Sequence, residues 1–207
     1  MLFRSAANRG DEIRVIATNK AGESDMLLLR EVEALLPRPP RRAKKVFLSY
    51  SHNNTHWLGR LRTYLGGLRR SKEIEVWTDQ EILPGEQWDQ VMMEKLKESD
   101  VFIMLLSADF ISSEYIWDKE LKNAFDDYKK TGKILIPIYT EPFDLYALPG
   151  IVEVPDKEGN VQSLKIQDFE IIPKDTSGHL KAISSWANHE EAFTAVATRV
   201  REALKGK

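Results

Sequence analysis

The chain has 207 residues, enough for one domain or for one domain plus an appendage. Because 42% of the residues are hydrophobic and 30% are charged, the chain can bury a core and is neither fibrous nor broadly disordered. A net charge of −2 argues against a nucleic-acid binder that works through a large basic surface, so we expect no direct nucleic-acid contact. The absence of cysteine excludes disulfide scaffolds, thiolate metal sites and cysteine nucleophiles, and it suits a reducing cytosol. We find neither a signal peptide nor an apolar run long enough to span a bilayer, and we expect a cytoplasmic protein without membrane contact.

The first 43 residues differ in composition from the rest. Of the five Trp, six Tyr and eight Phe residues, only Phe3 precedes residue 45, so this part has little with which to build a core. Apolar positions at helical spacing predict a short helix over residues 26–36. Residues 37–45 combine prolines with basic side chains and are interpreted as a solubilising tether, with an anionic partner as the alternative. We therefore divide the chain into a helical and linker segment, 1–43, and a domain, 44–205.

Short apolar runs alternate with amphipathic segments after the linker. The run 101–106 is continuously apolar, as expected of a strand that is covered on both faces. Strand–helix alternation of this kind predicts a parallel sheet with helices on both faces. Residues 151–154 and 161–166 flank a polar turn and predict a small hairpin or a loop insertion. The other predicted strands are 46–50, 74–77 and 134–139, the last expected to stop around its prolines, and the predicted helices are 55–70, 86–98, 113–130 and 189–204.

Two carboxylates are candidates for a site. Functional residues of parallel sheets lie just beyond the C-terminal strand ends, and Asp79 directly follows the predicted strand 74–77. An aspartate there is either functional or a turn former. Glu120 shares a helical face with Trp117 and Leu121, at a spacing of i, i+3 and i+4. Spacing alone favours a helix-surface acid over a site carboxylate.

Other catalytic signatures are weak or missing. No phosphate-binding glycine loop and no G-x-S-x-G elbow follows any predicted strand. His52 and His56 are spaced i, i+4, but their segment has loop character, so we interpret them as a polar loop and helix cap. We therefore predict no metal site.

Several segments in order resemble the Toll/interleukin-1 receptor (TIR) domain family, over about residues 44–205. Plant and animal members usually have W-C at the position where this chain has Tyr115-Ile116-Trp117. In this respect the chain is similar to prokaryotic members. Members commonly have four residues from this aromatic to a glutamate, whereas Glu120 lies three from Trp117 and five from Tyr115, so the aromatic partner is left open. The resembling segments are the F-x-S-Y strand in 45–52, V-W-T-D in 76–79, the Pro-Gly loop 82–88, the S-D-apolar-S strand 99–107, the aromatic–glutamate segment 112–121 and the I-P strand 133–139.

The resemblance implies a flavodoxin-like α/β fold with a central parallel sheet of about five strands. Many members cleave the nicotinamide–ribose bond of NAD⁺, and others only assemble signalling complexes. In the first case Glu120 would be the catalytic residue, stabilising an oxocarbenium-like ribose. Tyr50, Ser51, Asp79 and Trp117 would bind the substrate, with Trp117 as a wall of the site. NAD⁺ is then a substrate, and no cofactor is implied.

The resemblance also implies partners. The loop residues Ile82, Leu83, Pro84 and Gly85 would contact other TIR domains in head-to-tail self-association, and an upstream sensor would set the oligomeric state. We favour an NAD⁺ glycohydrolase or cyclase in immune or antiphage-type signalling. The alternative is a non-catalytic TIR adaptor, and a nucleotide-sugar or deoxyribosyl transferase is weaker because no second positioned carboxylate is present.

Overall fold

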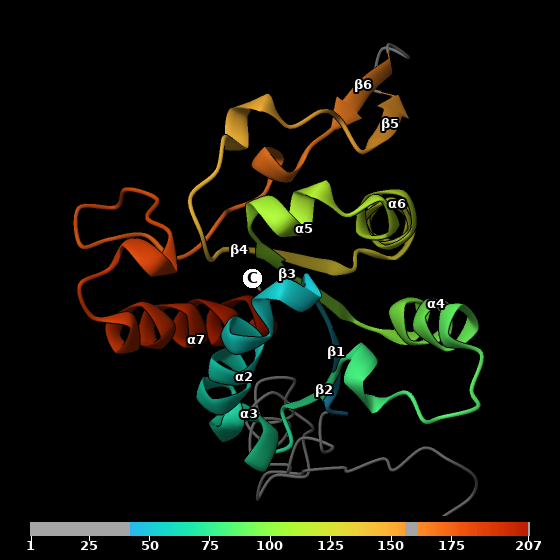
Figure 1. The fold of residues 1–207 in the computed structure, drawn as a ribbon, viewed down its shortest axis with the longest axis horizontal. Coiled ribbons are helices and arrows are strands. Elements are labelled where there is room, and N and C mark those ends of the chain that lie inside the picture. Colours follow the sequence, from blue (N-terminus) through green and yellow to red (C-terminus); the bar gives the residue numbers. More distant parts are fainter. Residues whose placement is uncertain (1–41, 156–160, 207) are drawn as a thin grey trace, which may run out of the picture. The chain divides into compact units, whose positions relative to one another are not determined.

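A computed structural model describes residues 42–155 and 161–206 (Figure 1). Four strands form a parallel sheet in the order β2-β1-β3-β4. The expected helix at 26–36 lies outside the described residues, as does the linker up to residue 41, so the division of the chain near residue 43 stays a prediction. The strands are β1 Lys44–Ser49, β2 Ile74–Trp77, β3 Val101–Leu106 and β4 Ile134–Tyr139.

The sheet has four strands and, at its β4 edge, one bridge in place of the expected fifth strand. The Tyr139 N–H donates to the Ile172 carbonyl at 2.7 Å, and the Ile172 N–H donates to the Pro137 carbonyl at 3.1 Å. Pairing with β4 is limited to Ile172, and the residues after it pair with another segment: the Pro173 carbonyl accepts from the Lys181 N–H at 3.1 Å, and Lys174 forms an isolated bridge with Leu180. Pro137 does not stop β4, because its backbone faces this outer edge rather than β3.

The helices largely follow the predicted segments. The predicted helix 55–70 is divided at Leu65, and the short helix α5 was not predicted. The helix expected at 113–130 contains a π-helical segment, η3. The helices are α2 Thr55–Tyr64, α3 Gly66–Arg70, α4 Trp88–Glu98, α5 Ala108–Ser112, η3 Ile116–Leu121, α6 Lys122–Thr131 and α7 His189–Lys205, and the short 3₁₀ turns are η1 His52–Asn54, η2 Asp79–Glu81, η4 Leu145–Ala147, η5 Ile166–Asp168 and η6 Ile183–Ser185.

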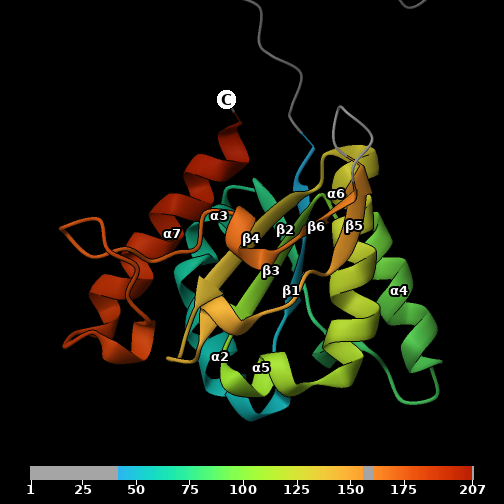
Figure 2. The same ribbon diagram turned by 90° about the horizontal axis from the view of Figure 1, so that it is seen from above.

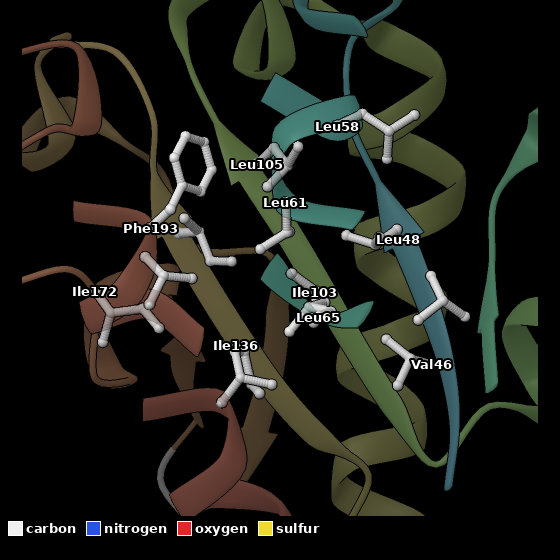
Figure 3. Packing of buried hydrophobic residues seen from close by; sticks show 14 of the residues in the cluster. Val46, Leu48, Leu58, Leu61, Leu65, Ile103, Leu105, Ile136, Ile172 and Phe193 are labelled. Carbon is white, nitrogen blue, oxygen red and sulfur yellow. The ribbon is translucent and has the colours of Figure 1, made fainter. Parts of the chain in front are cut away.

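Each face of the sheet carries its own core. Alternate strand residues such as Leu48 and Ile103 pack against α2, α3 and α7, where Leu61 and Phe193 are buried (Figure 3). The intervening residues, such as Phe102, pack against α4, α5, η3 and α6. Burial of both faces explains why the strands are continuously apolar rather than alternating.

A small antiparallel hairpin follows β4, as the sequence predicted. Its strands are β5 Val152–Pro155 and β6 Val161–Leu164. No helix in the two described ranges is both long and apolar enough to cross a membrane.

The C-terminal ends of the strands share one end of the sheet because the strands are parallel. The beginnings of α2 and α5 lie beyond this end (Figure 2). The segments that follow β1 and β2 are therefore brought close to one another, and side chains from both can line one site.

Candidate functional site

A cavity of about 240 Å³ lies beyond the C-terminal ends of β1 and β2. One side is polar and is formed by the end of β1, the turn that follows it and the start of η2. The other side is apolar and aromatic and comes from α4 and from the segment around η3. The lining residues are Leu48, Ser49, Tyr50, Ser51, His52, Asp79, Trp88, Met92, Ser113, Tyr115, Ile116 and Glu120.

Glu120 is the most deeply placed acid of the cavity. Its exposed fraction is 4%, and its Oε2 accepts a short hydrogen bond from the Oγ of Ser49, the last residue of β1. Burial raises the pKa of Glu120 to about 7, and the negative charge of Asp79 also raises it. The Ser49 hydrogen bond and the nearby His52 act in the opposite direction on this pKa. At neutral pH the carboxyl group is therefore close to half ionised, a property that is common at functional sites.

The π-helical segment decides which aromatic residue faces the cavity with Glu120. A π-helix pairs residues five apart, so Tyr115 and Glu120 fall on the same side of the segment, and both line the cavity. Trp117 does not line it and instead packs, partly buried, against the core that contains Phe102. The prediction that Trp117 walls the site is thus corrected: the wider turn rotates it away and places Tyr115 there.

Trp88 and Tyr115 form an aromatic wall. Their ring centroids lie 4.7 Å apart, and the Tyr115 hydroxyl donates to Asp89 Oδ1 at 2.7 Å. This hydrogen bond ties the start of α4 to the segment that carries Glu120. Trp88 is the first residue of α4; its exposed fraction is 39% and it lines the cavity.

Asp79 organises the opposite, polar wall. Its Oδ1 accepts a hydrogen bond of 2.8 Å from the Tyr50 hydroxyl, and its Oδ2 is in close contact with His52 Nε2. Burial, reinforced by Asp79, raises the pKa of Tyr50, so its hydroxyl remains a donor. The structure thus brings Tyr50, Ser51, Asp79 and Glu120 into one cavity. His52, which the sequence analysis interpreted as part of a polar loop, also lines the cavity.

A buried network holds the turn after β1 in place. Asn54 is 2% exposed; its Oδ1 accepts from the Ser107 hydroxyl, and its Nδ2 donates to Glu141 Oε1 at 3.3 Å. The same Glu141 oxygen accepts from Trp57 Nε1 at 2.8 Å. Because Ser107 follows β3 and Glu141 follows β4, three strand ends are joined. This network fixes the turn that carries Ser51 and His52.

The sequence profile of the TIR domain family matches residues 46–170. The chain belongs to the TIR domain family. A curated relative, the uncharacterized protein y4lF of Sinorhizobium fredii, is 31% identical over 158 residues. That match covers 76% of this chain and 43% of the relative, so the TIR chain spans less than half of the relative's length.

Three solved structures match parts of this TIR domain. The TIR domains of the activated Roq1 resistosome recognizing the effector XopQ match with a TM-score of 0.40 and 23% identity, over 46% of this chain and 57% of theirs. The TIR domain of the Toll-related receptor TRR-2 from Hydra magnipapillata matches with a TM-score of 0.39 and 22% identity, over 50% of this chain and 74% of that one. A prokaryotic SEFIR domain matches with a TM-score of 0.43 and 16% identity, over 80% of this chain and 94% of that one.

The predicted assembly loop of this TIR domain lies outside the cavity lining. Leu83 is 66% exposed, and its N–H donates to Glu86 Oε2 at 2.7 Å, which closes the loop on itself. Gly85 has φ +95°, a left-handed conformation that favours glycine. Ile82 is partly buried against the core, whereas Pro84 is exposed. The loop therefore presents the apolar side chains of Leu83 and Pro84 to solvent.

Within the described ranges, no three histidine or acidic side chains gather in a way that could hold a metal ion. His56 instead contacts the Trp57 ring, at 4.4 Å between centroids. The cavity of this TIR domain brings together a buried carboxyl group, hydroxyl donors and aromatic surface.

Replacing Ser49 by alanine is expected to raise the pKa of Glu120 above its value in the wild type, because the removed hydrogen bond favours the ionised form. The measurement is a ¹³C NMR titration of the Glu120 carboxyl carbon in both proteins. Ser112→Ala is a suitable control, because its hydroxyl bonds only the Asp109 carbonyl at 3.1 Å. An unchanged or lowered pKa in Ser49→Ala would contradict this account.

Proposed function

We propose that this TIR domain is an NAD⁺ glycohydrolase, with cyclisation as a variant of the same reaction, and that Glu120 is its catalytic residue. The observation that carries the proposal is a deeply buried carboxyl group, with a pKa of about 7, between an aromatic wall and a hydroxyl-rich wall. Such a combination suits a substrate with a flat ring attached to a sugar. Membership of a family that includes NAD⁺ hydrolases adds further support.

The proposed reaction breaks the bond between the ribose C1′ and the nicotinamide nitrogen. The bonding electrons leave with nicotinamide, which becomes neutral, so no acid has to protonate it. The ribose takes up positive charge and resembles an oxocarbenium ion. The ionised Glu120 lowers the energy of this cation through space or by accepting hydrogen bonds from ribose hydroxyls. Water, or a nucleophile within the substrate, then attacks C1′.

The two walls of the cavity suit the two parts of this substrate. The nicotinamide ring would pack against Trp88 and Tyr115, and aromatic surface of this kind also keeps water away from the reacting bond. The ribose would face Tyr50, Ser51 and Asp79. A volume of about 240 Å³ is below the usual range for a site that encloses a whole ligand, so the ADP part would extend out of the cavity.

Assembly is part of the proposal. Leu83, exposed on the loop beside α4, would bind a neighbouring TIR domain in a head-to-tail contact, which can extend into open filaments. The proposed setting is cytoplasmic immune or antiphage-type signalling under an upstream sensor, and it comes from the family alone. A non-catalytic adaptor that uses the same loop is the second candidate, favoured by the exposure of Leu83.

Specific activity is expected to rise with protein concentration or crowding, and Leu83→Asp is expected to remove most of this rise, because a charge at the contact opposes association. The measurement is nicotinamide release from NAD⁺ by the full chain, with separation of linear and cyclic products. Val161→Asp is a matched control, since Val161 is 65% exposed and lies on β6. Self-association through Leu83 without nicotinamide release at any concentration would favour the adaptor.

A further inference from the structure

The charges around the cavity are unevenly distributed. Two carboxylates, Glu120 and Asp79, line it, and the lining, all of it within the described residues, contains neither lysine nor arginine. The one side chain there that can become cationic is His52, whose side chain is 72% exposed and bonded to Asp79. By contrast, the Asp79 side chain is 11% exposed and Glu120 is almost completely buried.

Because both carboxylates are largely buried, their negative charges act strongly inside the cavity. His52 is exposed to solvent, so its positive charge, when present, offsets them only weakly. Charges near a protein surface interact several times more strongly than charges in bulk water, and a narrow site lined by one sign of charge concentrates that effect. The two carboxylates also act on each other, since Asp79 disfavours ionisation of Glu120. A positively charged group in the cavity offsets the negative charge and the repulsion between the two carboxylates. An anionic group increases the repulsion.

Asp79 can also distinguish between a carboxamide and a carboxylate substituent on a bound ring. A carboxylate has about four acceptor positions and no donor. Asp79 uses two of them, for the Tyr50 hydroxyl at 2.8 Å and for His52, and this leaves positions for an incoming N–H. A carboxamide supplies such a donor. A carboxylate supplies none and brings a second negative charge.

We infer that the cavity selects a positively charged pyridinium ring that carries a carboxamide over one that carries a carboxylate, and that Asp79 is the residue that sets this selectivity. The inference rests on the proposed function, because it assigns the ring of the substrate to this cavity. It also places the phosphates of a dinucleotide outside the cavity, at the mouth where His52 lies.

The test uses small probes that bind without being cleaved. 1-Methylnicotinamide carries the ring charge and the amide, 1-methylnicotinate has the same shape with a carboxylate, and nicotinamide has the amide without the ring charge. Binding is followed by the change in tryptophan fluorescence, to which Trp88 in the cavity wall contributes, and by NMR saturation transfer. The wild type is expected to bind 1-methylnicotinamide at least about tenfold more tightly than either other probe.

Asp79→Asn is expected to reduce the preference for 1-methylnicotinamide over 1-methylnicotinate to about threefold or less, because an amide neither repels the carboxylate nor attracts the cation. Asp118→Asn is the control, since Asp118 is an exposed acid paired with Lys122, and it should keep the full preference. Equal binding of the probes by the wild type, or an unchanged preference in folded Asp79→Asn, would overturn the inference.

A second measurement needs no variant. Wild-type protein is expected to cleave NAD⁺ with a kcat/KM at least about tenfold above that for its nicotinic acid counterpart. Cleavage of NAD⁺ without this preference would overturn the selectivity alone. Selective probe binding without any cleavage of NAD⁺ would contradict the proposed hydrolase and leave the selectivity standing.

Discussion

Replacing Glu120 by glutamine is expected to slow nicotinamide release from NAD⁺ by about a thousandfold or more. Glutamine has nearly the same shape and keeps an oxygen that can accept from Ser49, but it carries no negative charge toward the ribose. Losing one well-placed electrostatic partner of a transition state costs about a hundredfold to a thousandfold, and losing a full charge in a buried site costs more. The measurement is nicotinamide release under the conditions that give the highest wild-type activity.

Asp118→Asn is the matched control for this substitution. Asp118 lies on the same π-helical segment, but its side chain is 59% exposed and paired with Lys122 at 2.6 Å. This variant should keep wild-type activity within a small factor. Full activity in Glu120→Gln would remove Glu120 from the reaction, and an equal loss in both variants would point to a disturbed segment rather than to lost chemistry.

Relative to the wild type, the Glu120→Gln variant is expected to become more stable as pH rises. Glu120 has a folded-state pKa of about 7, above the ordinary value of 4.5, so its ionisation is favoured by unfolding. The wild type therefore loses stability as pH rises from about 4.5 to 7 and is constant above that range with respect to this group. Glutamine does not titrate, so the variant avoids the loss. The variant-minus-wild-type difference in unfolding free energy should grow by about 3 kcal/mol between pH 4.5 and pH 8.

Denaturant unfolding of both proteins at the two pH values measures this difference. A change of about 3 kcal/mol corresponds to a shift of roughly 6–12 °C in Tm for a domain of this size. Asp118→Asn should show no comparable change, because Asp118 is exposed. A pH-independent difference would mean that Glu120 is not held near neutrality by burial. A gain in stability with loss of activity would fit the usual cost of a functional site.

Much of the fold could be predicted because it depends on local pattern. The apolar strands, the amphipathic helix ending near Leu204 and the hairpin after β4 were each visible as periodicity with turn residues between them. The number of strands could not be predicted in the same way, because the segment at the β4 edge pairs with β4 only at Ile172 and then pairs with Leu180 through Lys174. That outcome depends on where a distant segment packs against the sheet edge.

Physical reasoning from the sequence could predict the candidate site where it depends on strand ends, whereas Glu120 was predicted from the family resemblance. Tyr50, Ser51 and Asp79 lie within two residues of the ends of β1 and β2, so the parallel pairing of these strands brings them together. The aromatic partner of Glu120 could not be chosen from spacing, since an α-helix would favour Trp117 and a π-helix favours Tyr115. His52 and Trp88 enter the cavity through tertiary contacts with Asp79 and Tyr115.

By itself, then, the amino-acid sequence determined a cysteine-free, near-neutral chain with a parallel sheet and the motifs of the TIR family. These follow from composition, periodicity and local motifs, which do not depend on contacts between distant residues. Only the tertiary structure decided that Glu120 is buried against Ser49, that its pKa lies near 7, and that Tyr115 rather than Trp117 faces it. The reason is physical: desolvation and the direction of a side chain are set by which segments pack around it, and the packing joins residues more than 70 positions apart.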